Sequence, residues 1–219
     1  MQRGIEYAKQ IVNKDIPSGE LEYLSCERFL EDLERDWEYV FDESRADRII
    51  KFIENYCRQS KGVFAGKTIT LLPFQVYDLI NIFGWVNKTD GARRFTRAFI
   101  EMARGNAKST IMSAIALYGM MADVIYPPGK PEKILFEKNP QVVCTAYDRE
   151  QARIVLDEAK VMAQASTEIM KRLIVKKGYV EHKERGGSLK ALSKDTRNKD
   201  GMNVSIAILD QLVVLSRNT

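Results

Sequence analysis

The chain has little histidine and cysteine, and this scarcity argues against several kinds of site. Among its 219 residues there is one histidine, His182, and there are three scattered cysteines, Cys26, Cys57 and Cys144, with no Cys-x-x-Cys pair. A structural zinc site needs four closely spaced sulfur or imidazole ligands, so the sequence does not support one. We expect the cysteines to be free thiols. We expect His182, which lies in a charged stretch, to be a solvated loop residue.

Long apolar segments are also missing. No run reaches the roughly 18–20 apolar residues that a membrane-spanning helix needs. The first residues, Met1-Gln2-Arg3-Gly4-Ile5-Glu6, do not form a signal-peptide core. With 45% hydrophobic and 29% charged residues, the composition is that of a globular protein. These features predict a cytosolic protein that makes no contact with a membrane.

Positive charge is in mild excess, with a net charge of +4, and it concentrates late in the chain. This charge is compatible with an acidic partner such as DNA, although a solvated surface is the favoured explanation. The basic stretches are Lys171-Arg172, Lys176-Lys177, Lys183 to Arg185 and Lys194 to Lys199.

The first 65 residues have helical periodicity. One helix is expected from Ser25 to about Trp37, and a second from Glu43 to Arg58, where Ile49, Ile50 and Ile53 recur at helical spacing. Their remaining positions are largely charged, so each helix is expected to pack along one side. Residues 1–65 are therefore predicted to be a helical N-terminal lead-in.

From residue 66 to residue 219, extended and helical segments alternate. Such alternation predicts an α/β fold built on a largely parallel sheet. We expect extended segments at 68–71, 97–102, 141–146 and 204–209, and helices at 73–82, 109–122 and 148–163.

A loop between the expected 97–102 strand and the 109–122 helix has the context of a phosphate-binding loop. It reads Met102-Ala103-Arg104-Gly105-Asn106-Ala107-Lys108-Ser109. In such loops backbone N–H groups and a helix N-terminus hold the phosphates, the lysine contacts the β- and γ-phosphates, and the serine hydroxyl binds Mg²⁺. The expected nucleotide-binding residues here are Gly105, Asn106, Ala107, Lys108, Ser109 and Thr110.

The loop lacks the glycines that usually stand at its two ends, where this chain has Met102 and Ala107. Alanine is tolerable at the second position if its φ stays negative, because it adds only a methyl group. The alternative is an ordinary helix start, with Asn106 as the cap and Lys108 exposed.

A second motif supports the nucleotide interpretation. Asp210 ends the apolar segment 204–209. A carboxylate at the carboxyl edge of a parallel sheet is well placed to hold a hydrated Mg²⁺ together with Ser109.

Taken together, these motifs resemble the large terminase subunit of tailed double-stranded DNA bacteriophages. Several segments carry the resemblance in the expected order: Leu24 to Arg35, Gly66-Lys67 with Leu72-Pro73-Phe74-Gln75, Arg93-Arg94-Phe95, Glu101 to Ser109, and Thr145-Ala146 with Glu150 to Arg153. That family's phosphate loop commonly lacks the first glycine and carries an arginine.

The resemblance implies a DNA-packaging ATPase of the P-loop NTPase type, with helices on both faces of its sheet. It implies ATP and Mg²⁺ as cofactors, with Gln75 bonded to adenine and Arg104 contacting the γ-phosphate or acting as an arginine finger. The implied partners are double-stranded DNA, a small terminase subunit and a portal protein. A homo-oligomer is implied for the full-length form, and the cytoplasm of a bacterial host for its location.

Two departures from the family pattern limit this interpretation. The family ends its second motif with Asp-Glu, whereas this chain has Asp210-Gln211. Glutamine can orient a water molecule but cannot take its proton as a carboxylate does. Arg104, Lys108 and Gln211 are thus the candidate catalytic residues, and impaired hydrolysis is expected.

The second departure is length, because the family's coupling motif and nuclease domain would lie beyond residue 219. We therefore expect residues 66–219 to be an incomplete P-loop ATPase domain, from a truncated prophage gene, that exposes apolar residues 212–215 at an open sheet edge. One alternative is a non-catalytic remnant that binds DNA or protein. An unrelated kinase or helicase is a further alternative.

Overall fold

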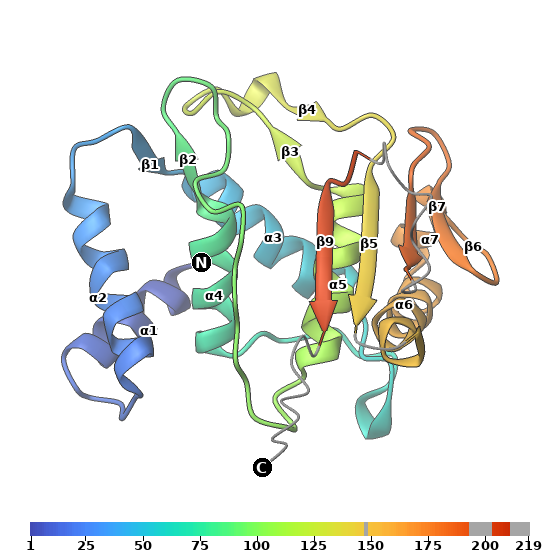
Figure 1. Cartoon of the computed structure of the whole chain (residues 1–219), viewed down its shortest axis with the longest axis horizontal. Coiled ribbons are helices and arrows are strands. Elements are labelled where there is room, and N and C mark those ends of the chain that lie inside the picture. Colours follow the sequence, from blue (N-terminus) through green and yellow to red (C-terminus); the bar gives the residue numbers. More distant parts are fainter. Residues whose placement is uncertain (147–148, 193–202, 211–219) are drawn as a thin grey trace, which may run out of the picture. The chain divides into compact units, whose positions relative to one another are not determined.

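The computed structural model describes residues 1–146, 149–192 and 203–210. It is a mixed α/β structure (Figure 1). The chain divides into two compact units, each made of three separate segments of the sequence. The first unit comprises Met1–Glu54, Thr70–Ile100 and Val124–Leu135, and the second comprises Asn55–Ile69, Glu101–Asp123 and Phe136–Thr219. The described helices are all too short or too polar to cross a membrane.

The first unit is mainly helical. Its elements are α1 (Gln2–Val12), α2 (Glu20–Glu34), β1 (Tyr39–Phe41), α3 (Glu43–Tyr56, which ends just past the unit boundary), α4 (Pro73–Gly84) and β2 (Trp85–Asn87). Helix α1 packs on α2 and α4, and β1 pairs antiparallel with β2. A cluster of rings fills the core, with Phe29 in edge contact with Phe41, Tyr77 and Trp85. The predicted helices around residues 25–37, 43–58 and 73–82 are confirmed.

The second unit is built on a five-stranded sheet in the order β6-β7-β8-β5-β9. Strand β5 pairs parallel with β8 and with β9, whereas β6–β7 and β7–β8 are antiparallel. The strands are β5 (Gln141–Ala146), β6 (Leu173–Val175), β7 (Tyr179–His182), β8 (Ser188–Ala191) and β9 (Ile206–Asp210). The helices are α5 (Lys108–Met121), α6 (Arg149–Gln164) and α7 (Thr167–Arg172).

Helix α5 lies unusually close to the sheet near its C-terminal end. A Cβ atom added at Gly119 would come within 2.6 Å of Ile206 Cδ1 and 3.2 Å of Val142 Cγ2. Because both contacted residues lie near the starts of their strands, α5 runs antiparallel to β5 and β9. Its N-terminus consequently lies at the end of the unit where these two strands finish, as Figure 1 shows.

Three expectations about this part of the fold need correction. The sheet is mixed, and only its β8-β5-β9 part is parallel. Helices were expected on both faces of the sheet, but α5 and α6 pack on each other as well as on β5, β8 and β9, so both lie on one face. On the opposite face of β9, the side chain of Leu209 is exposed. Residues 97–102 form no strand: the segment is exposed, with Phe99 81% exposed, and pairs with no described strand. A strand needs a ladder partner, so apolar composition alone does not create one.

The remaining described elements are short. They are η1 (Gly62–Phe64), β3 (Val124–Ile125), η2 (Pro131–Lys133) and β4 (Leu135–Phe136). Residues 68–71, expected to be extended, contribute only an isolated bridge between Thr68 and Arg58. The apolar run 212–215 lies outside the described residues. The expected division into residues 1–65 and 66–219 stays a prediction.

Candidate functional site

The loop that precedes α5 turns sharply and is open to solvent. Residues 103–107 are exposed, and Arg104 and Gly105 form a turn. Gly105 has a φ of +90° and nothing within 4 Å of the position a Cβ would take. Positive φ is easily reached by glycine, and the open space around Gly105 allows a ligand to approach the backbone closely. This geometry is suited to a phosphate-binding loop.

Ala107 does not meet the condition of a negative φ under which alanine would be well tolerated. Its φ is +57° and its ψ is 29°, which is the left-handed region that side chains disfavour. Alanine here therefore costs about 1–2 kcal/mol relative to a favourable backbone conformation. The position keeps the conformation that glycine would supply, but this chain holds it with a strained residue.

The first turn of α5 can receive an anion. It begins at Lys108 directly after Ala107, has no side-chain cap and no acidic residue in its first turn. The unpaired N–H groups and the positive end of the helix dipole attract negative groups such as phosphates. Lys108, Ser109 and Thr110 are half-buried, and within the described chain neither Arg104 nor Lys108 has a carboxylate partner.

Asp210 ends β9 and is the acidic residue at this end of the sheet that has an unsatisfied atom. Its side chain is buried, at 4% exposure, and Oδ1 has no hydrogen-bond partner among the described residues. A buried carboxylate oxygen without a partner is costly, so its position favours a cation or water at that point. Strand β9 ends at the same end of the unit as α5 begins, so Asp210 and Ser109 both lie at that end of the sheet. Carboxylate and hydroxyl oxygens are of the kind that hydrated Mg²⁺ uses.

Gln75 lies in the first unit, at the third position of α4, and is buried rather than on the surface. Its Oε1 accepts the backbone N–H of Leu72 at 2.9 Å, and so it caps the start of α4 behind Pro73. This local role was not anticipated, and its predicted contact with adenine stays a prediction. Gln211 lies outside the described residues.

Glu158 of α6 is a site residue that the sequence analysis missed. It is buried, at 6% exposure, and it accepts hydrogen bonds from the hydroxyls of Thr110 and Ser60. Lys61 Nζ lies 3.7 Å from its other oxygen. The available signal was a carboxylate next to the apolar stripe of α6, where Val155 and Ala159 are buried.

His182 and Arg185 secure the opposite end of α5. Arg185 Nη2 donates to the carbonyls of Met120 and Met121, each at 2.8 Å. His182 is 2% exposed, and its Nδ1 accepts the backbone N–H groups of Glu184 and Arg185. The expectation that His182 is solvated is therefore wrong. Burial and the nearby Arg185 charge lower the pKa of His182.

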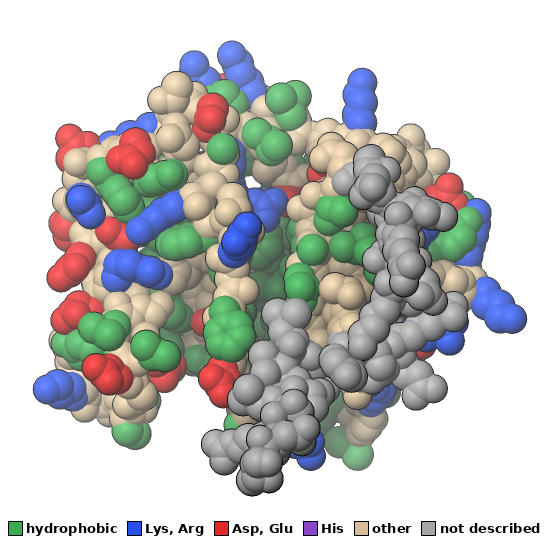
Figure 2. Space-filling model, in the orientation of Figure 1, with side chains coloured by type: hydrophobic (Ala, Val, Ile, Leu, Met, Phe, Trp, Pro, Cys, Tyr) green, Lys and Arg blue, Asp and Glu red, His purple; other side chains and the backbone are tan. Residues whose placement is uncertain are grey.

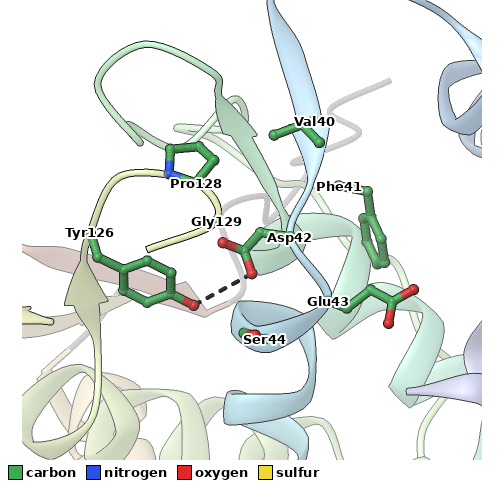
Figure 3. A pocket seen from close by; sticks show the side chains of 8 residues that line it. All are labelled: Val40, Phe41, Asp42, Glu43, Ser44, Tyr126, Pro128 and Gly129. Atoms are coloured by element: carbon green, nitrogen blue, oxygen red, sulfur yellow. Dashed lines mark hydrogen bonds between the residues drawn. The ribbon is translucent and has the colours of Figure 1, made fainter. Parts of the chain in front are cut away.

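The first unit has a shallow pocket of about 210 Å³ that is unsuited to a nucleotide (Figure 3). Asp42 and Glu43 line it, and Tyr126 donates a hydrogen bond to Asp42 at 3.4 Å. Two carboxylates would repel a triphosphate. No predicted site residue is among the residues that line this pocket, so the phosphate loop remains the better candidate.

Comparison with known proteins gives consistent matches. The family model described as "Terminase large subunit, ATPase domain" matches residues 73–219. The "Terminase, large subunit" of Enterobacteria phage HK97 is 28% identical in an alignment of 177 residues that covers 77% of this chain and 30% of that protein. The crystal structure of the HK97 bacteriophage large terminase is similar with a TM-score of 0.59 and 26% identity, covering 76% of this chain and 31% of that one. This chain thus spans about a third of the length of the relatives it matches.

Proposed function

Because the chain belongs to the terminase large-subunit family through its ATPase domain, we propose that it binds ATP and Mg²⁺ as part of a bacteriophage DNA-packaging motor. The observation that carries the proposal is Asp210 at the end of β9, whose buried Oδ1 has no hydrogen-bond partner among the described residues. The adjacent strand β5 and the antiparallel helix α5 bring the start of α5 to the same end of the sheet.

The proposed roles follow from the chemistry of these groups. Backbone N–H groups of residues 105–110 hold the phosphates, and Lys108 contacts the β- and γ-phosphates. Ser109 and Asp210 hold Mg²⁺, which neutralises charge on the phosphate oxygens when it is bound. Arg104 is exposed in the loop and can reach charge that develops on the γ-phosphate. Gln75 contacts adenine.

Gln211 is expected to limit the rate of ATP hydrolysis. A carboxylate at this position would take a proton from the attacking water, whereas an amide only orients the water. The proposed activity is therefore ATP binding with slow hydrolysis.

The partners proposed for the complete motor are double-stranded DNA, a small terminase subunit and a portal protein, in an oligomeric assembly in the bacterial cytoplasm. Lys and Arg side chains are interspersed with Asp and Glu on the face drawn in Figure 2. On this face, the mixture differs from the single-sign surface that purely electrostatic DNA binding uses.

Equilibrium binding of a fluorescent ATP analogue with Mg²⁺ tests the proposal. We expect Lys108→Ala to weaken binding at least about tenfold, because a charge-assisted contact to phosphate is lost. Lys171→Ala, at an exposed position, is the matched control and should bind as the wild type does. Equal affinity in Lys108→Ala and wild type would refute the proposed site.

Hydrolysis is tested separately. Gln211→Glu should restore part of the roughly 10²–10⁴-fold that a general base contributes. If the variant binds ATP normally and turnover does not increase, Gln211 is not what limits hydrolysis. DNA binding that falls steeply with salt and is indifferent to ATP would favour the alternative of a non-catalytic DNA-binding piece.

A further inference from the structure

Residues 58–68, here called the 58–68 loop, form a loop whose two ends are hydrogen-bonded to each other and whose tip exposes apolar side chains. Arg58 and Thr68 form a bridge at its base, and Gln59 exchanges backbone hydrogen bonds of 2.8 Å with Lys67 and Gly66. Its tip is η1, where Val63 is 87% exposed and Phe64 is 59% exposed. The loop therefore has an ordered base and a tip that solvent surrounds.

Glu158 joins this loop to the first turn of α5. Its Oε1 accepts the hydroxyl of Thr110, which is the third residue of α5, and the hydroxyl of Ser60 at 3.1 Å. Lys61, from the same loop, lies 3.7 Å from Oε2. The Glu158 side chain is only 5% exposed, whereas that of Lys61 is 75% exposed. The two hydroxyl bonds in the buried part are consequently stronger links than the screened ion pair.

A hydrogen bond between α5 and α6, one turn away from Glu158, fixes the two helices relative to each other. Ser113, one turn after Thr110 on α5, donates to the carbonyl of Val155 at 2.9 Å, and Val155 lies one turn before Glu158 on α6. Both helices therefore keep a fixed register where Glu158 lies. A shift of the first turn of α5 would break the Thr110 bond and leave a buried carboxylate poorly satisfied.

We propose that Glu158 is a positioning residue that couples nucleotide bound at the start of α5 to the 58–68 loop. Phosphates that fix the first turn of α5 also fix Thr110, and through Glu158 they fix Ser60 and the base of the loop. By linkage, an ordered 58–68 loop strengthens nucleotide binding by the same factor. This inference rests on the proposed ATP binding at α5.

Hydrogen exchange of the backbone amides of Gln59 and Gly66 tests the link without nucleotide. In Thr110→Val, which keeps the shape of the side chain but not its hydroxyl, these amides should exchange about tenfold faster, the factor expected from one charge-assisted hydrogen bond. Thr110→Ser keeps the hydroxyl and is the matched control, with exchange close to that of the wild type. Unchanged exchange in Thr110→Val would overturn the link.

Addition of MgATP tests the coupling. In the wild type, exchange at Gln59 and Gly66 should slow when MgATP binds. In Ser60→Ala, which touches no group proposed to bind nucleotide, MgATP should still bind but should no longer slow exchange in the loop. Glu158→Gln, which keeps an oxygen acceptor and removes the charge, should retain the response.

The outcomes separate the two proposals. A wild-type chain that fails to bind MgATP refutes the proposed function and the coupling with it, while the nucleotide-free comparison still decides whether the link exists. A wild-type chain that binds MgATP without any change in the loop refutes the coupling alone. A loop response that persists in Ser60→Ala also refutes it.

Discussion

At the residue scale, Ala107 offers a direct test of the loop geometry. Its φ of +57° is unfavourable for alanine and accessible to glycine. We expect Ala107→Gly to raise the free energy of unfolding by up to about 1 kcal/mol, because relief of strain exceeds the extra entropy of the unfolded chain. Thermal unfolding measures the change. Ala114→Gly, in the buried interior of α5, is the control and should destabilise by about 1 kcal/mol.

Asp78 of α4 predicts a pH dependence. Burial, with a smaller contribution from Glu22, raises the pKa of Asp78 from 3.8 to about 7. Since the folded chain holds this proton more tightly than the unfolded chain, this group's contribution to stability falls as pH rises from about 4 through 7. Asp78→Asn should be more stable than wild type at pH 8, by about 1–2 kcal/mol, because the amide carries no charge that partial burial would desolvate.

Urea unfolding of Asp78→Asn and wild type at pH 4 and pH 8 checks this expectation. His182 and the other titrating groups are common to both proteins, so the difference between them isolates Asp78. A difference of equal size at both pH values would show that ionisation of Asp78 is not its cause.

The residues of the candidate site differ in how far the sequence could reveal them. Lys108, Ser109 and Asp210 follow from motif order, because each stands at a fixed place relative to a helix start or a strand end. The positive φ of Ala107 depends on how the loop enters α5, and the burial of His182 depends on the turn that brings Arg185 to the end of α5. Such features arise from tertiary contacts, which local composition does not specify.

At the element scale, α5 is stabilised by Arg185 at its C-terminal end. The guanidinium donates to the carbonyls of Met120 and Met121 and lies 4.9 Å from the ring centroid of Phe136. Lysine cannot reproduce this planar fork, so Arg185→Lys should lower the free energy of unfolding by about 1–3 kcal/mol. Urea unfolding measures the loss. Arg153→Lys, on α6, is the control with an expected change within about 0.5 kcal/mol.

The elements that the sequence predicts well are the long ones. Helices α3 to α6 and strands β5 and β9 have enough residues for their periodicity or apolar character to be read. Strands β6, β7 and β8 have three or four residues each, and their antiparallel pairing depends on contacts across turns. Residues 97–102 have the composition of a strand without a described partner, so composition alone misled the prediction.

At the scale of the whole molecule, the proposed ligand should change thermal stability. A ligand that binds only the folded chain adds about 2.7 kcal/mol when its concentration is 100 times Kd. For a chain of 219 residues this corresponds to a rise in melting temperature of about 5–10 °C. Differential scanning fluorimetry with MgATP checks the rise, and Lys108→Ala, which should bind at least about tenfold more weakly, should show at most about half of that rise at the same concentration. A rise of equal size in the variant would indicate binding elsewhere.

The close approach of α5 to the sheet at Gly119 has a mechanical consequence. Gly119 holds the helix against Ile206 and Val142, Arg185 holds its last turn, and Glu158 holds its first. A helix held at three points bends little between them, so movement at the site is left to residues 103–107 and to the first turn of α5 that follows them. The segment best able to move is residues 103–107, which are exposed and include two residues with positive φ, Gly105 and Ala107. Load applied to the sheet would be passed along α5 to the proposed phosphate site with little loss, and the exposed loop is the part best able to move when a ligand enters or leaves.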